Sequence, residues 1–321
     1  MSDDLVNRTT AIMMPDYQKG FVNCMSKKRV EIAWLKANDC ISYNQGGRSI
    51  EWRARLSTGT PFGFLGGMEG HTPAIQNDFQ VPTLSWRGLA HAFAASYAER
   101  MLCKEDWQII ALLKALSESM TEDWEQEWGT QFYSDGTRLS NTAFHGLAAS
   151  IPTSPGTFAG LSQTTFTNWA NQAIDATGFV ADPMNFIHQL ILACAVGTKG
   201  GRDRNQIDIL LGTSTDYRAV VQAEQTKQRV VEQDVKLAKM GFANIACYGV
   251  PFAWSEYATS GKIYGLNSAL FEFLCAGPDM IDAGVQDSVG FPVLKLGYAI
   301  ALHQLLNKSP RGSGVLYNTT A

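Results

Sequence analysis

The sequence predicts an α+β fold built around a long antiparallel hairpin and one long helix. Three observations predict it: strict alternation of apolar and polar residues over 49–56, an amphipathic stretch over 104–129, and intermixed helix and strand patterns over 182–266. A chain of 321 residues can bury roughly 75% of the surface that its unfolded form exposes. One large domain or two modest ones can therefore fold without cross-links.

The composition is that of an ordered globular protein. Hydrophobic residues make up 45% of the chain and charged residues 17%, far from the polar, highly charged composition of disordered segments. The net charge of −4 leaves no whole-chain basic field of the kind that attracts phosphates regardless of sequence. Tight nucleic-acid binding is therefore not expected.

Six cysteines are scattered along the chain, without a CxxC pair or a nearby pair of histidines that would indicate a zinc site. We expect free thiols in a reducing compartment. The start of the sequence lacks the basic and apolar stretches of a signal peptide, and no run reaches the ~18 apolar residues of a membrane span. These features favour a protein that is made in a cytoplasm, stays soluble and has no membrane partner.

The first forty residues are polar except for one helical stripe. Tyr17, Phe21 and Met25 are four residues apart and follow Pro15, which is well placed to begin a helix. This pattern indicates an N-terminal arm, and a short surface helix of an ordinary domain is the alternative.

The hairpin is predicted from two alternating segments. Residues 49–56 place Ile50, Trp52, Ala54 and Leu56 on one face. A second alternation begins at Pro82 and runs on toward Ser96, which favours an antiparallel partner strand.

Between these strands lie residues 57–80, which are rich in glycine yet include Phe62, Phe64, Leu65 and Met68. A loop longer than ~15 residues is uncommon in a compact domain, and exposed aromatic side chains need a partner surface. We expect this loop to contact a neighbouring subunit, with a lid over its own domain as the alternative.

Residues 104–129 form the strongest predicted helix. Its apolar stripe consists of Ile109, Leu113, Leu116, Met120 and Trp124. Its charged face consists of Lys114, Glu118, Glu122 and Glu125. At 1.5 Å per residue this helix would be about 39 Å long. A turn is predicted at 134–136, followed by a loop rich in Ser, Thr, Pro and Gly to about residue 160.

The remaining pattern is a mixture of short elements. Asp182 and Pro183 are a cap and first-turn pair for a helix through Cys194, and Ser214 or Thr215 would cap a helix through Gln225. Strands are predicted at 207–211, 244–254 and 262–266, with a basic, glycine-rich loop at 197–204, weak alternation at 293–305 and a loose tail at 309–321.

No catalytic constellation is recognisable. Ser260-Gly261-Lys262 is similar to the end of a phosphate-binding loop, but Glu256 occupies the position that requires the first glycine. The five histidines are isolated from one another in the sequence, and the carboxylates around Trp124 fit a solvated helix face. The sequence therefore predicts no catalytic residues, no cofactor and no metal site.

Six segments together carry a family resemblance: 49–55, 132–137, 145–147, 234–245, 248–254 and 260–267. In this order and spacing they resemble the major capsid proteins of tailed bacteriophages, which have the Hong Kong 97-type (HK-97-like) fold. The likeness covers residues 49–316. It rests on the order and spacing of the pieces, since none is decisive alone.

The resemblance implies a division of the chain into four parts. These are an N-terminal arm at 1–48, an extended loop at 49–88, a peripheral domain at 89–177 and 288–321 with the spine helix 104–129, and an axial domain at 178–287. It also implies that the extended loop lies over an adjacent subunit. The residues expected to make this contact are Trp52, Arg53, Arg55, Phe62, Phe64 and Leu65.

The implied function is structural: self-assembly into hexamers and pentamers of an icosahedral head that encloses double-stranded DNA and binds a portal at one vertex. The implied location is the virion capsid, assembled in the cytoplasm of the bacterial host. No lysine occurs between Lys36 and Lys104, which argues against the loop-lysine cross-links of some family members. Because the arm starts almost at Met1, a separate scaffolding protein is expected, and a decoration protein is left open.

One alternative is a structural role on the same fold without DNA, as in a defective prophage particle, and there are two others. An encapsulin-like nanocompartment shares the fold but holds an enzyme cargo. An α+β hydrolase or lyase of unrecognised type is a more distant possibility, weakened by the missing constellation.

Overall fold

The computed structural model describes residues 30–56, 79–95, 106–195, 206–226, 244–279, 282–287 and 295–320. Helices and strands mix along this part of the chain, which confirms the predicted α+β class. The helices are α2 (Val30–Ala37), α4 (Asp106–Phe132), α5 (Arg138–Asn141), α6 (Leu147–Ser150), α7 (Pro183–Ala193) and α8 (Ser214–Thr226). None of the described helices is long and apolar enough to cross a membrane.

The long helix α4 confirms the strongest prediction and extends it by three residues. Its buried stripe runs from Leu116 through Met120 and Trp124 in steps of four and continues to Trp128 and Phe132, so the helix ends where the stripe ends. Lys114 and Glu118 lie on the exposed side and form an i,i+4 ion pair of 3.9 Å. The predicted turn follows, with a positive φ of 87° at Gly136.

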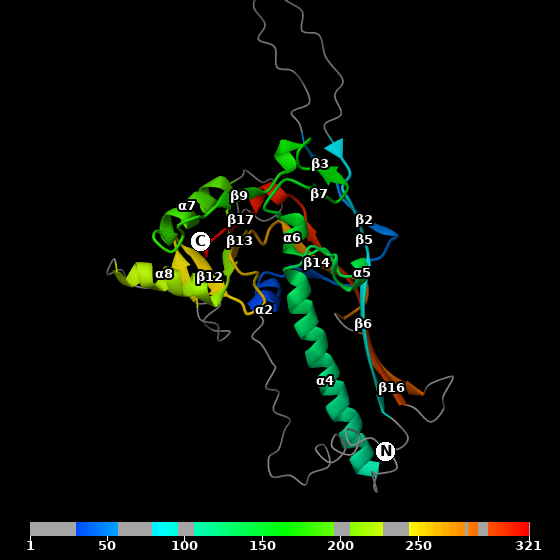
Figure 1. The fold of residues 1–321 in the computed structure, drawn as a ribbon. Coiled ribbons are helices and arrows are strands. Elements are labelled where there is room, and N and C mark those ends of the chain that lie inside the picture. The colour runs from blue at the N-terminus through cyan, green and yellow to red at the C-terminus, as the bar shows by residue number, and fades with distance from the viewer. Residues whose placement is uncertain are drawn as a thin grey trace, which may run out of the picture.

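The helix α4 lies along a sheet whose longest strand is β16 (Lys295–Asn307) (Figure 1). One edge of β16 pairs with β14 (Phe271–Cys275) and then β15 (Asp282–Asp287), and its other edge pairs with β6 (Arg87–Ala95). A short parallel strand, β1 (Ile41–Ser42), extends the sheet beyond β14. Trp128, Phe132, Phe144 and Phe273 form the centre of the core between helix and sheet.

A second sheet forms a separate core with α7 and α8 (Figure 1). In spatial order its strands are β11 (Asn244–Cys247), β12 (Val250–Trp254), β10 (Ile209–Gly212), β13 (Lys262–Leu266), β17 (Gly314–Tyr317) and β9 (Gln172–Asp175). The predicted strand at 244–254 is therefore a hairpin. Its two-residue turn is Tyr248-Gly249, with φ of 52° and 80°, the left-handed values that such turns require.

The N-terminal caps of α7 and α8 differ from the sequence expectation. Thr213, one residue earlier than predicted, caps α8: Asp216 N donates to Thr213 Oγ1 over 3.3 Å, and Thr213 N donates to Asp216 Oδ2 over 3.1 Å. This reciprocal pair is a capping box in which an aspartate replaces the usual glutamate. Asp182 stands at the start of α7 as expected, but its side chain makes no capping hydrogen bond.

The prediction of a loose tail at 309–321 is wrong. Residues 314–317 form β17, which lies between β13 and β9 with Val315 and Leu316 fully buried. The sheets also cross the expected boundaries at 177/178 and 287/288, because β9 and β17 join the second sheet while β14 and β15 join the first. Sheet pairing, which joins distant segments, sets this division rather than position along the chain.

Part of the expected arm packs into the main core. In α2, Trp34 and Leu35 are buried, and the Tyr133 hydroxyl donates to Glu31 Oε1 over 2.6 Å at the end of α4. Burial and the nearby Glu31 carboxylate raise the pKa of Tyr133 well above its usual value. The stripe of Tyr17, Phe21 and Met25 lies outside the described residues, as does the basic loop at 197–204.

Candidate functional site

The predicted hairpin is present, and its root has two distinct faces. Strand β2 (Ser49–Glu51) pairs with β5 (Thr83–Ser85), and β3 (Ala54–Arg55) pairs with β4 (Phe79–Gln80). The continuation beyond Trp86 differs from the expectation, because it becomes β6 and pairs with β16 instead. The described root of the hairpin therefore lies where the first sheet ends (Figure 1).

The inner face of the root is fixed to the rest of the subunit. Ile50, Leu56 and Leu84 are buried against Phe158 and Trp169 in a third apolar cluster. Backbone bonds add to this attachment: Thr83 N donates to Ala159 O over 3.0 Å. Phe158 and Ala159 belong to the segment of β7 (Thr157–Phe158) and β8 (Leu161–Ser162), so a small two-stranded sheet supports the hairpin.

On the outer face of the root, exposed apolar side chains lie beside two arginines, and Glu51 is exposed on the same face. Phe79 is 61% exposed and Val81 56% exposed, and Phe79 lies directly across from Arg55. Arg53 and Arg55 are both exposed, as an interface role requires. Exposed large apolar side chains beside cations are typical of contact surfaces. Sequence reasoning missed Phe79 and Val81, although the alternation through Thr83 and Ser85 places them on the face opposite Leu84.

Trp52 has a contact within its own chain. Its ring is half-buried and lies 6.2 Å, centroid to centroid, from that of Trp169, and its indole Nε1 donates to Lys308 O over 3.2 Å. This side chain thus anchors the hairpin root to the segment after β16. The remaining predicted contact residues, Phe62, Phe64 and Leu65, lie outside the described residues.

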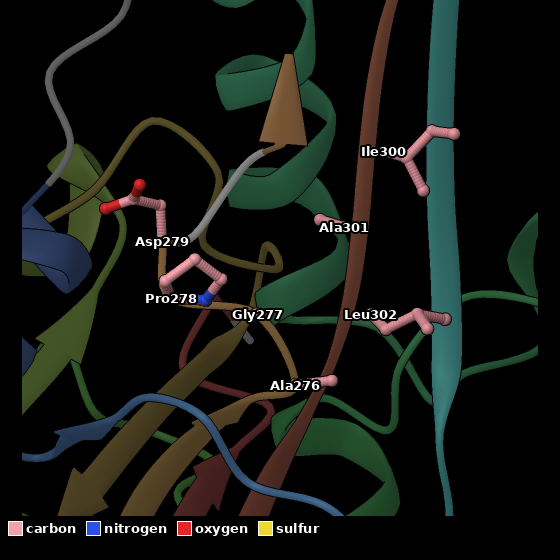
Figure 2. Close-up of a pocket in the computed structure, with 7 residues that line it drawn as sticks. All are labelled: Ala276, Gly277, Pro278, Asp279, Ile300, Ala301 and Leu302. Carbon is pink, nitrogen blue, oxygen red and sulfur yellow. The ribbon is translucent and has the colours of Figure 1, made fainter.

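A second exposed apolar surface lies on β16 and β6. Ile300 is 46% exposed and Leu302 50% exposed, and they stand across from Ala90 and Gly88 of β6. Figure 2 shows both side chains pointing to one side of β16 and Ala301 to the other. A hollow of about 430 Å³ is lined by residues 300–302 of this strand and by the loop 276–279, which follows β14. The weak alternation at 293–305 was the available sequence signal.

Among the described residues no group of three or more His, Cys, Asp or Glu side chains gathers as a metal site. Of the described histidines, His303 is buried between Trp124 and Phe144, His188 stacks on Tyr248, His91 lies on β6, and His145 contacts the side chain of Gln304.

By sequence, neither a family model nor a curated protein matches the chain. By structure, the capsid of cyanophage A-1(L) matches with a TM-score of 0.69 and 16% identity, over 96% of this chain and 98% of that one. The capsid of Myoviridae phage XM1 matches with a TM-score of 0.61 and 14% identity, over 95% and 96%. The holo-SrpI encapsulin of Synechococcus elongatus PCC 7942 matches with 0.56 and 12%, over 94% of each chain. These end-to-end likenesses show that the chain has the Hong Kong 97-type fold that its sequence predicted.

Proposed function

We propose that the chain is the major capsid protein of a tailed bacteriophage, a structural subunit rather than an enzyme. Copies would assemble as hexamers and pentamers into an icosahedral shell that encloses double-stranded DNA and resides in the virion. The observation that carries the proposal is the structural match to the cyanophage capsid, which spans 96% of this chain and 98% of that one. A match of this extent includes the hairpin and both sheets together.

The shape of the subunit supports the proposal. The hairpin leaves one end of the first sheet, while α4, β6 and β16 extend toward the other end (Figure 1). Exposed apolar residues occur on both parts: Phe79 and Val81 on the hairpin side, and Ile300 and Leu302 on β16. A subunit with separated contact surfaces can bind several neighbours at once, and each ~1.4 kcal/mol gained per contact strengthens association tenfold.

Sedimentation of the purified protein, with negative-stain microscopy of the fast fraction, tests the proposal. Closed shells of megadalton mass are expected. A 35.1 kDa monomer that persists at high concentration, with the scaffolding protein added, would overturn it. A monomer with enzymatic turnover would instead point to the α+β enzyme.

An encapsulin-like nanocompartment is the second candidate, favoured by the match to the holo-SrpI encapsulin. The contents of purified particles separate the two. Double-stranded DNA inside the shells supports a phage head, whereas a packaged enzyme supports a nanocompartment.

The proposal includes partners that follow from a phage-head role. These are a separate scaffolding protein, a portal at one vertex and, on some shells of this kind, a decoration protein. DNA would be enclosed without sequence-specific binding, and the net charge of −4 is compatible with a lining that lets DNA pack and leave. Co-expression with the neighbouring structural genes and mass spectrometry of the resulting particles would identify these partners.

A further inference from the structure

The side chain of Gln304 lies at the point where the hairpin joins the rest of the subunit. It is fully buried on β16, and its carboxamide makes four hydrogen bonds. Nε2 donates to Ser85 O over 3.0 Å and contacts His145 Nδ1 at 2.8 Å, while Oε1 accepts from His145 N over 2.8 Å and from Leu305 N over 3.2 Å. Both donors and both acceptor sites of the amide are therefore used.

These contacts fix the protonation state of His145. The Ser85 carbonyl can only accept and the His145 backbone N–H can only donate, so Nε2 must face the former and Oε1 the latter. The second hydrogen of Nε2 then points at His145 Nδ1, which must be unprotonated to accept it. A proton added to the neutral ring would go onto Nδ1, the nitrogen that faces Gln304.

The contacts join three parts of the subunit. Ser85 ends β5 at the transition from the hairpin to β6, and Gln304 belongs to the central strand of the first sheet. His145 follows the turn after α4, where Gly136 packs so closely that a Cβ there would lie 3.2 Å from the imidazole Cδ2. Gly136 therefore restricts the imidazole on its Cδ2 side. A proton added to Nδ1 would then displace Gln304 and, through the bond to Ser85 O, the hairpin root.

We propose that Gln304 and the neutral imidazole of His145 form a latch that positions the hairpin root, and that protonation of His145 Nδ1 opens it. Two donors would then face each other, and the carboxamide could not turn over without losing Ser85 O and His145 N. Gln304 is thus a positioning residue for the hairpin. The consequence for assembly rests on the proposed function, but the latch itself is a property of the single subunit.

Two charged groups face the imidazole. Burial and the Arg87 guanidinium, at the start of β6, lower the pKa of His145, while the hydrogen bond with Gln304 and the Asp135 carboxylate oppose them. The Gln304 contact favours the charged ring only if Nδ1 donates, whereas the contacts with Ser85 O and His145 N leave the donor Nε2 facing Nδ1. Asp135 is itself held by Thr137, whose N and Oγ1 donate to Oδ1 over 3.0 and 2.6 Å. The latch is therefore closed at neutral pH and opens in acid, below the usual histidine pKa of 6.5.

Hydrogen exchange of unassembled subunits between pH 7.5 and 5 tests the latch. The readout is exchange of the β2 and β5 amides divided by exchange of β13 amides, which corrects for the intrinsic pH dependence. In the native protein this ratio is expected to rise about tenfold on acidification, which corresponds to about 1.4 kcal/mol. His145→Asn, which keeps an acceptor but cannot titrate, should give a flat ratio, and the exposed His188→Asn should follow the native protein.

An equal acid rise in His145→Asn, or no rise in the native protein, would overturn the proposal. Gln304→Met should raise the ratio at every pH, and if that variant does not fold, the two histidine variants still decide the question. The ¹⁵N shift of His145 Nδ1 adds a direct readout, because an accepting nitrogen is expected at pH 7.5 and a protonated one in acid. None of these measurements needs an assembled shell. A failed latch would therefore appear in the exchange ratios, whereas a failed capsid assignment would appear as the absence of shells in sedimentation.

Discussion

The indole Nε1 of Trp52 donates a hydrogen bond to the backbone carbonyl of Lys308 over 3.2 Å. This bond joins the outgoing strand of the hairpin to the end of β16, and the ring packs beside Trp169. The sequence predicted Trp52 as a contact to an adjacent subunit, and that role stays a prediction. The structure gives the same residue a role in anchoring the hairpin.

We expect Trp52→Ala to lower the free energy of unfolding by about 1 to 3 kcal/mol, because a half-buried ring and one hydrogen bond are lost. Trp52→Phe, which keeps most of the packing, should cost about 1 kcal/mol. Urea unfolding of the unassembled subunit measures both. Unchanged unfolding midpoints together with failed shell formation would assign Trp52 to the subunit interface alone.

The exposed pair Phe79 and Val81 should matter for assembly rather than for folding. Replacing both by serine removes apolar side chains that are 61% and 56% exposed, so the free energy of unfolding should change by no more than about 0.5 kcal/mol per site. Shell formation, followed by sedimentation, should be strongly reduced. Leu139→Ser, at a site 51% exposed on α5, is the matched control and should still form shells. Normal shells from the double variant would remove this surface from the proposed interface.

The buried His303 predicts how stability depends on pH. Burial lowers its pKa from 6.5 to about 3 among Trp124, Phe144 and Phe273, so the folded state keeps it neutral. Between these two pH values the unfolded chain binds a proton that the folded chain does not. Stability therefore falls as the pH drops below 6.5, by about 1.4 kcal/mol per pH unit for this group once the unfolded histidine is protonated.

His303→Phe should fill the same aromatic cluster without titrating. Urea unfolding at pH 7.5, 6 and 5 is expected to show a smaller acid loss in this variant than in the native protein. Carboxylates contribute equally to both proteins, so the difference between them reports His303. Parallel pH profiles would show that the histidine is not held neutral in the fold.

Cysteine reactivity follows from burial in the same way. Burial raises the pKa of Cys194, Cys247 and Cys275 to about 12, and for Cys247 the Glu224 carboxylate adds to the effect. Since the thiolate is the reactive form, these three thiols should resist alkylation at pH 8 in the native protein and react in urea. Peptide mass spectrometry after timed labelling measures each site. Rapid native labelling of any of the three would place it at the surface.

Part of the fold could be predicted because the spacing of apolar residues along a segment indicates which of its side chains are buried. The stripe from Leu116 to Trp124 and the alternation around Ile50 each need only neighbouring residues to show which side faces the core. The outer-face residue Phe79 was not predicted, because it precedes Pro82, where the recognisable alternation begins. Arg53 and Arg55 were placed correctly on an exposed face, while their contact to a second subunit stays a prediction.

Other features have no local signal. Gln304 and His145 are single polar residues in unrelated segments, and their pairing arises only when β16 meets the loop after α4. The four-residue strand β17 reads as a loose tail because it is too short to show a period. Its partners β9 and β13 come from segments that are distant in the chain, so its burial depends on tertiary pairing.

The last prediction concerns β17, which lies inside the second sheet between β13 and the edge strand β9. Leu316 is fully buried in the second core, and the strand lies so close to its neighbours that a Cβ at Gly314 would lie 2.6 Å from Gln172 O. We expect Leu316→Ala to lower the free energy of unfolding by about 2 to 5 kcal/mol, from lost burial and the cavity left behind. Val180→Ala, an aliphatic truncation at a site 60% exposed, should cost less than about 0.5 kcal/mol. Urea unfolding with an unchanged m-value compares the two. Equal costs would mean that residues 314–317 behave as the loose tail that the sequence suggested.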